Sequence, residues 1–141
     1  MTVLLGSSGV SWSADFQKGL DAYKRGDYAT ALKEWTPLAE QGYAVARFNL
    51  GLMYEDGLGV PQDSKTAVKW FRLGAEQGLA GAQYNLGLMY GKGLGVPQDY
   101  VRAHMWFNLS ASRGDKDAVK GRDIVVNRMT KEQIAEARNL A

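Results

Sequence analysis

Apolar residues recur in the middle of the chain in pairs of stripes, three or four positions apart. One stripe covers residues 46–54 and a second covers residues 67–75. Side chains at this spacing share one face of an α-helix. The pattern therefore predicts two amphipathic helices whose apolar positions are Ala46, Leu50, Met53 and Tyr54 in the first, and Ala67, Trp70, Phe71, Gly74 and Ala75 in the second.

The segment between the stripes reads GLGVPQD and predicts a turn. Gly57 and Gly59 tolerate a positive φ, and Pro61 cannot continue a helix. Asp63 stands where a carboxylate can accept hydrogen bonds from the free N–H groups of the next helix. Gly78 follows the second stripe as a C-terminal cap. Together these features predict an antiparallel helix pair.

This unit recurs almost unchanged. Residues 46–78 align with residues 82–114 at an offset of 36, without a gap, and 20 of the 33 positions are identical. A fixed period of about 20–50 residues is typical of solenoids, in which each unit buries its apolar face against its neighbours. We therefore expect an all-α solenoid of antiparallel helix pairs that offers one long surface to a partner.

A shorter unit precedes the two full copies. Trp35 and Gly42 align with Phe71 and Gly78, and the loop shrinks to RGDY, with Asp27 as the expected helix cap. Pro37 falls inside the second helix of this unit, where it removes a backbone hydrogen bond.

A degraded fourth unit ends the chain. Arg122 takes the position of Leu86, so we expect this helix to be buried on one side only, as in a terminal cap. The stretch IVVN at 124–127 is β-branched and fits a strand, but its helical neighbours favour a helix. Thr130 and Gln133 form a capping box that starts a last helix, whose apolar side is Ile134, Ala137, Leu140 and Ala141.

These boundaries predict one helical-repeat domain over residues 14–141. Its parts are repeat one at 14–42, repeat two at 43–78, repeat three at 79–114, and a capping helix pair at 115–141. Residues 1–13 are set apart as a disordered end, a cloning remnant or the remnant of a secretory signal. A signal remnant implies a periplasmic or secreted protein; otherwise we expect a cytoplasmic one.

Composition narrows the function further. With 17 basic and 15 acidic residues, the net charge of +2 leaves no basic excess for nucleic acid. There is no cysteine, no apolar run long enough to span a bilayer, and no histidine or acidic cluster for a metal. His104 is the only histidine, and we interpret it as a helix-surface residue. We therefore expect no cofactor, no metal and no catalysis.

The repeated string resembles the Sel-one-like repeat, a 36-residue relative of the tetratricopeptide repeat. This resemblance implies a right-handed superhelix of helix pairs and a protein–protein adaptor, common in bacteria. The signature positions are Leu50, Gly51, Tyr54, Gly57, Gly59, Asp63, Ala67 and Trp70 in repeat two, and Leu86, Gly87, Tyr90, Gly93, Gly95, Asp99, Ala103 and Trp106 in repeat three.

In tetratricopeptide-like arrays the first helix of each unit lines the concave face, which is where we expect a protein or peptide partner. Asn49 and Asn85 are the leading candidates, because an amide both donates to and accepts from a peptide backbone. Alternatively, each asparagine bonds the neighbouring repeat. The other polar candidates on this face are Arg47, Gln83, Glu55 and Lys92.

The first helices also carry a second apolar side. It consists of Phe48 with Leu52 in repeat two and Tyr84 with Leu88 in repeat three. Packing against the preceding unit explains it, and so does an exposed groove for a partner. Two other function classes stay open: an exported enzyme or small-molecule binder acting on cell-wall or β-lactam-related substrates, and a self-assembling structural module.

Overall fold

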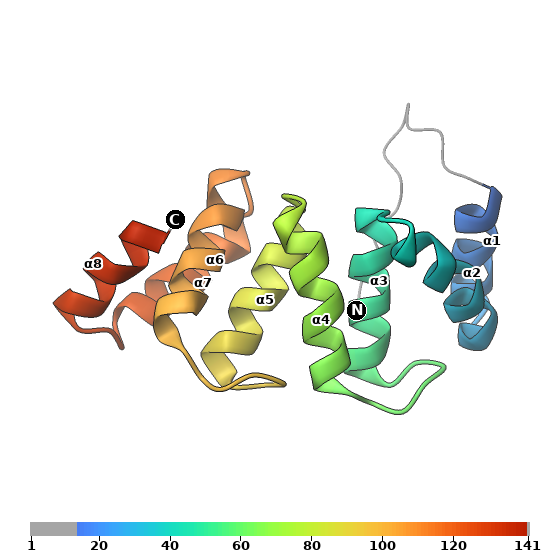
Figure 1. Cartoon of the computed structure of the whole chain (residues 1–141), viewed down its shortest axis with the longest axis horizontal. Coiled ribbons are helices and arrows are strands. Elements are labelled where there is room, and N and C mark those ends of the chain that lie inside the picture. The colour runs from blue at the N-terminus through green and yellow to red at the C-terminus, as the bar shows by residue number, and fades with distance from the viewer. Residues whose placement is uncertain (1–13, 141) are drawn as a thin grey trace. The chain divides into compact units, whose positions relative to one another are not determined.

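The computed structural model describes residues 14–140, and all regular structure in this range is α-helical (Figure 1). The predicted all-α class is confirmed, and the stretch 124–127 is not a strand but the end of a helix. The helices are α1 (Ala14–Lys24), α2 (Tyr28–Glu40), α3 (Ala44–Asp56), α4 (Ser64–Glu76), α5 (Ala80–Lys92), α6 (Tyr100–Ser112), α7 (Lys116–Val126) and α8 (Lys131–Leu140).

The chain forms two compact units whose boundary falls inside α4, between Trp70 and Phe71. In the first unit α2 packs against both α1 and α3. In the second unit α6 is central and contacts α5, α7 and α8, while α5 also touches α7. Each unit therefore has its own set of packed helices.

The core of the first unit is built around Trp35. Its side chain is fully buried, its ring stacks on Phe16 at 5.7 Å and on Tyr23 at 5.9 Å, and its Nε1 donates to the Phe16 carbonyl oxygen at 3.1 Å. Gly19 of α1 faces the indole so closely that a Cβ there would clash with it. A glycine at this position therefore lets α1 and α2 approach each other.

The core of the second unit is built around Phe107 of α6. A Cβ added to Gly87 of α5 would lie 2.7 Å from the ring Cδ1, and one added to Gly121 of α7 would lie 2.9 Å from Cε1. The phenyl ring thus occupies the space that the missing side chains of two glycines leave beside it. The pairing of small and large side chains holds α5, α6 and α7 together.

The predicted GLGVPQD turn has the same conformation in both copies. Gly57 and Gly93 end their helices in the left-handed region with φ of 68° and 70°. The carboxylates of Asp63 and Asp99 each accept from a backbone N–H three residues ahead, at 3.2 and 3.1 Å. The predicted glycine turn and aspartate caps are therefore confirmed.

The ends of the repeat array also follow the expectations. Asp27 caps α2 by accepting from the Thr30 N–H at 3.2 Å. Thr130 and Gln133 form the capping box, each side chain bonding the backbone N–H of the other at 3.1 and 2.9 Å. Arg122 is half-buried on α7 and donates to an Asn108 oxygen at 3.1 Å, so a polar contact replaces the leucine packing of the full repeats.

Candidate functional site

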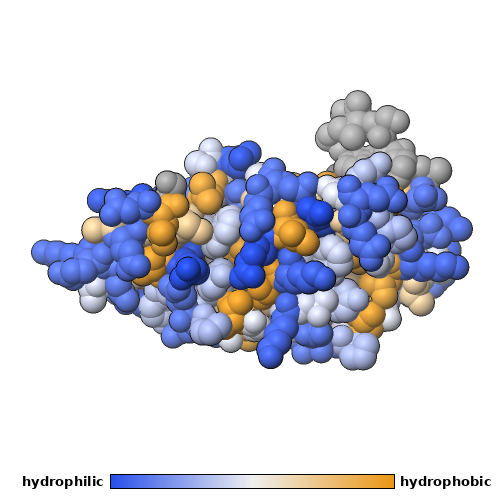
Figure 2. All heavy atoms as spheres, viewed as in Figure 1, coloured by the Kyte–Doolittle hydropathy of each residue, from blue (hydrophilic) through white to orange (hydrophobic). Residues whose placement is uncertain are grey.

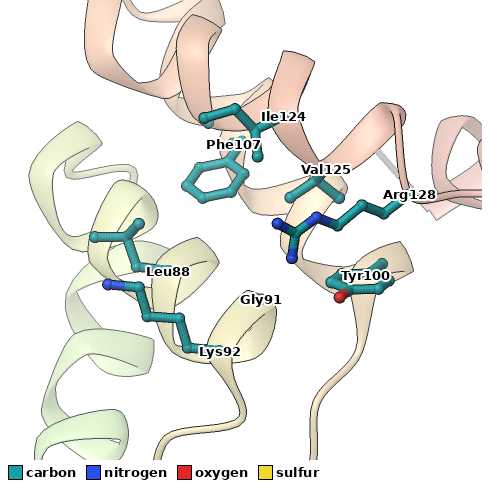
Figure 3. A pocket seen from close by; sticks show the side chains of 9 residues that line it. Leu88, Gly91, Lys92, Tyr100, Phe107, Ile124, Val125 and Arg128 are labelled. Atoms are coloured by element: carbon teal, nitrogen blue, oxygen red, sulfur yellow. The ribbon is translucent and has the colours of Figure 1, made fainter.

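The second unit contains an open groove between α5, α6 and α7, with a volume of about 230 Å³ (Figure 3). Leu88 of α5 lies on one side, Ile124 and Val125 of α7 lie on the other, and Phe107 of α6 lies between them. Ile124 keeps 59% of its surface exposed, although it is an aliphatic residue. The groove is therefore an apolar surface that is open to solvent.

Three polar residues also line the groove: Lys92, Tyr100 and Arg128. Lys92 lies at the end of α5, and Arg128 lies just beyond α7, with its guanidinium reaching towards Tyr100 (Figure 3). Both cations are exposed. Their side chains make no ion pair or hydrogen bond with the residues that the structure describes. The rim is therefore positively charged.

Elsewhere, exposed apolar residues are scattered. Figure 2 shows a largely hydrophilic face on which hydrophobic residues form separate patches. The large apolar side chains exposed in the described part of the chain are Tyr43, Leu94, Val119, Ile124 and Leu140. Among these five, Ile124 alone lines the groove.

A second hollow lies over the loop between α5 and α6, but its charges are already engaged. The Arg72 guanidinium donates to the Tyr90 hydroxyl at 2.7 Å, and Arg102 pairs with Asp99 at 2.9 Å. The groove, with its unpaired cations, is therefore the stronger candidate for binding.

The second apolar side of the first helices is buried to different extents in repeats two and three. Phe48 and Leu52 of α3 are buried, at 5% and 8% exposure. Tyr84 of α5 is half-buried, with its ring centroid 5.8 Å from that of Phe107. Leu88 lines the groove. Packing therefore accounts for this side in repeat two, whereas in repeat three part of it is an open groove.

Two of the predicted partner-binding residues make equivalent contacts inside the protein. Arg47 Nε donates to the Ala39 carbonyl oxygen at 2.9 Å, and Gln83 Nε2 donates to the Ala75 carbonyl oxygen at 3.2 Å. The donor and the acceptor of the second bond each lie 36 residues after those of the first. The first-helix residue thus bonds the last turn of the preceding helix in each case, which gives these two residues a structural role.

The other candidates differ in how accessible they are. Asn49 is fully buried, Asn85 and Glu55 are half-buried, and Lys92 is exposed. Of the six residues, Lys92 alone lines the groove. Burial removes Asn49 from direct contact with a partner unless α3 rearranges. Partner binding by the others stays a prediction.

Sequence reasoning missed Ile124, Arg128 and Tyr100 as groove residues. Ile124 lies 36 positions after Leu88, so the repeat register could have placed the two on equivalent helix faces. Arg128 lies beyond the end of α7, where the repeat alignment is weak, and the sequence holds no comparable signal for it.

The interpretation of His104 as a surface residue is wrong. The imidazole is 6% exposed, and its Nδ1 is buried with no hydrogen-bond partner among the described residues. It occupies the position of Val68, a buried residue in the preceding repeat, so the repeat places it in the core. Desolvation by burial lowers the pKa of His104 from 6.5, and the positive charges of Arg122 and Arg138 lower it further.

The depressed pKa of His104 makes acid sensitivity a testable expectation. The neutral imidazole is the form that the folded chain prefers, so below pH 6.5 the unfolded chain takes up a proton first. Stability is then complete above this pH and falls as the pH drops below it, until the imidazole of the folded chain is protonated as well. Thermal denaturation across this range should show a falling melting temperature.

His104→Val provides the matched control, because valine stands at the equivalent position 68. The variant should lie within about 1 kcal/mol of the wild type at about pH 8, and it should lose most of the acid sensitivity. Asp27 and Asp63 do not confuse the result, since side-chain and backbone hydrogen bonds from Thr30 and Thr66 hold their pKa values below 3.8. An equally steep decline in His104→Val would show that another group is responsible.

No group of three or more His, Cys, Asp or Glu side chains within residues 14–140 is placed to hold a metal ion. None of the helices in that range combines the length and apolar character that crossing a bilayer demands.

A model of the Sel1 repeat matches residues 44–79 and 80–115. These segments begin one residue later than the predicted repeats two and three. Among curated proteins, the DAP3-binding cell death enhancer 1 proteins of Rattus norvegicus and Mus musculus are 41% and 40% identical over 45 residues. That alignment covers 32% of this chain and 9% of each of those proteins.

Two solved structures are also similar to this chain. One is a protective antigen of uropathogenic Escherichia coli strains that displays an SLR fold, with a TM-score of 0.85 and 33% identity. The other is a Sel1 repeat protein from Oxalobacter formigenes, with a TM-score of 0.72 and 33% identity. The matches cover 90% and 75% of this chain, but 28% and 44% of those chains.

Proposed function

Because this chain belongs to the Sel1 repeat family, we propose that it is a non-catalytic scaffold that binds a segment of another protein. Proteins of this family generally mediate protein–protein interaction. The observation that carries the proposal is the groove of the second unit, an apolar, solvent-open surface between α5, α6 and α7. An exposed apolar patch framed by polar residues is typical of an interaction site.

The size of the groove favours a protein segment over a small molecule. Its volume of about 230 Å³ is below the range of about 300–1,000 Å³ that is usual for small-molecule pockets. Protein interfaces, by contrast, often depend on one or two anchoring side chains that fill a small hollow. The groove has the dimensions for such an anchor.

The proposed binding face includes α5 and α7. From the predicted set it keeps Lys92, which lines the groove, and Asn85, which is half-buried on the same helix. It adds Ile124 and Arg128 from the opposite side of the groove. Gln83 supports this face indirectly, since its side chain bonds the Ala75 carbonyl group at the end of α4.

A pair of variants on one helix tests the proposal. Ile124→Glu places a charge in the groove, whereas Val119→Glu places one on an exposed position of α7 outside it. Affinity capture by the full chain, quantified by mass spectrometry, should enrich the same proteins with wild type and Val119→Glu. We expect Ile124→Glu to reduce their capture at least about tenfold, because the substitution removes part of the apolar wall and its carboxylate can pair with Arg128, four residues ahead.

Both positions are exposed, so both variants should melt close to the wild-type temperature, which separates lost binding from lost folding. Equal capture by Ile124→Glu and Val119→Glu would remove the groove from the binding surface. Specific capture by none of the three proteins would count against the scaffold itself.

A further inference from the structure

The groove of the second unit has a charge pattern that its surroundings do not explain. The two ionic side chains in its lining are both cations, Lys92 and Arg128, and no carboxylate is among the lining residues. The chain as a whole is nearly balanced, with 17 basic and 15 acidic residues. The excess of positive charge at the groove is therefore a local feature and not a consequence of a basic protein.

Some cations on the surface of the described chain are paired with a carboxylate, whereas the two at the groove are not. Lys18 lies 3.2 Å from Glu34, Arg102 lies 2.9 Å from Asp99, and Arg122 lies 3.8 Å from Asp123. Lys92 and Arg128 have no such partner within residues 14–140. Their charges are therefore available to a ligand.

The two full repeats differ at this helix end. The residues before the turn glycine are Glu55 and Asp56 in α3, but Gly91 and Lys92 in α5. The change removes two negative charges and adds a positive one at a position where the rest of the turn is conserved between the copies. Gly91 itself lines the groove, and its lack of a side chain keeps the space beside Lys92 open.

The apolar part of the groove lies between the cations. Leu88 is on the side of Lys92, Val125 is on the side of Arg128, and the Phe107 ring lies between them (Figure 3). An apolar side chain seated against Phe107 would thus have a cation within reach on each side. Cations at the edge of an apolar contact favour partners of opposite charge and speed their encounter.

We infer that the groove binds an acidic peptide segment whose apolar side chain is seated against Phe107 and whose flanking carboxylates pair with Lys92 and Arg128. This inference rests on the proposed scaffold function and specifies the chemistry of its partner. Arg128 can bind a carboxylate through two N–H groups, while Lys92 acts as a point charge. Leu88, Ile124 and Val125 contribute the apolar walls.

Fluorescence anisotropy with three synthetic, labelled octapeptides tests the inference on the full chain. Each peptide has a central Leu-Phe pair, which is flanked by Glu and Asp in the first, by Gln and Asn in the second, and by Lys and Arg in the third. We expect the acidic peptide to bind at least about tenfold more tightly than the neutral one, and the basic peptide more weakly than either. Added salt should weaken binding of the acidic peptide.

A fourth peptide separates the groove from general charge attraction. It keeps the acidic flanks but replaces Leu-Phe with Ser-Ser, and we expect its affinity to fall at least about tenfold, since the apolar anchor is missing. Equal binding of the two acidic peptides would overturn the inference, because the apolar part of the groove would then make no contribution.

A variant of the protein can be designed from the residues at the equivalent positions of the preceding repeat. Gly91→Glu with Lys92→Asp installs the residue types of Glu55 and Asp56, which this helix end already accommodates in α3. The double variant should bind the acidic peptide at least about tenfold more weakly, as should Arg128→Gln, while Val119→Glu should bind it as the wild type does. A double variant with unchanged affinity would overturn the assignment of Lys92.

The remaining outcomes also decide the question. Preference for the neutral or basic peptide, or no binding of any peptide, would overturn the inference. So would sedimentation showing that the chain self-associates and that Ile124→Glu abolishes this, since a second copy would then occupy the groove. If proteins are still captured in an Ile124-dependent manner while the charge variants have no effect, the scaffold function stands and the acidic partner alone is excluded.

Discussion

Replacing Phe107 with alanine should lower the free energy of unfolding of the second unit by about 3–5 kcal/mol, the usual cost of removing a buried phenyl ring. The ring is 2% exposed and lies against Gly87 of α5 and Gly121 of α7. Because both flanking positions are glycines, no side chain there can move into the space that the ring leaves. The part of the free-energy cost that comes from the unfilled cavity should therefore be close to its full size.

Urea denaturation followed by far-ultraviolet circular dichroism measures this loss, and hydrogen exchange places it in α5, α6 and α7. Phe107→Leu keeps most of the apolar volume and should cost less than about 1.5 kcal/mol. A domain of this size is stable by about 5–15 kcal/mol, so the alanine variant can leave the unit partly unfolded. A loss below about 1 kcal/mol for Phe107→Ala would contradict the packing described above.

The helices and their ends could be predicted from the sequence because the forces that set them are local. The apolar stripes, the turn glycines and the capping aspartates act within a few residues of one another. Each of these features also recurs in the second copy of the repeat, 36 residues later. Asp63 and Asp99 accordingly make the same capping bond, at 3.2 and 3.1 Å.

The burial of individual polar residues could not be predicted in the same way. Asn49 and Asn85 have identical places in the repeat, yet the first is fully buried and the second is half-buried. Their burial depends on tertiary packing, which the local sequence pattern does not specify. For His104, by contrast, the equivalent Val68 was an available sign of burial.

The groove was only partly predictable, because it depends on the convergence of three helices. Leu88 and Lys92 were recognised on α5 as an apolar and a polar candidate. Their partners across the groove, Ile124 and Arg128, lie in the last repeat, where the similarity to the full repeats is weak. The net charge of the chain also gave no sign of the cationic rim, because a net charge of +2 does not say where the charged residues lie.

Two glycines of α5, placed four residues apart, should respond in opposite ways to the same substitution. Helix propensity alone predicts that Gly→Ala stabilises either position by about 0.5–1 kcal/mol. A methyl group at Gly91 would meet just the Ala103 Cβ, at an ordinary 3.8 Å. Gly91→Ala should therefore stabilise the second unit by about 0.4–1 kcal/mol.

A methyl group at Gly87 would instead lie 2.7 Å from Cδ1 and 2.8 Å from Cε1 of Phe107. The same ring is also in close contact with Gly121 of α7, so α5 or α6 must shift to make room. Gly87→Ala should therefore destabilise the second unit by about 1–3 kcal/mol despite its better helix propensity. Urea denaturation measures both variants, and combining Gly87→Ala with Phe107→Leu should cost less than the sum of the two changes. If Gly87→Ala were as stabilising as Gly91→Ala, α5 and α6 would not be in close contact at this ring, and the groove that Phe107 helps to form would have a different shape.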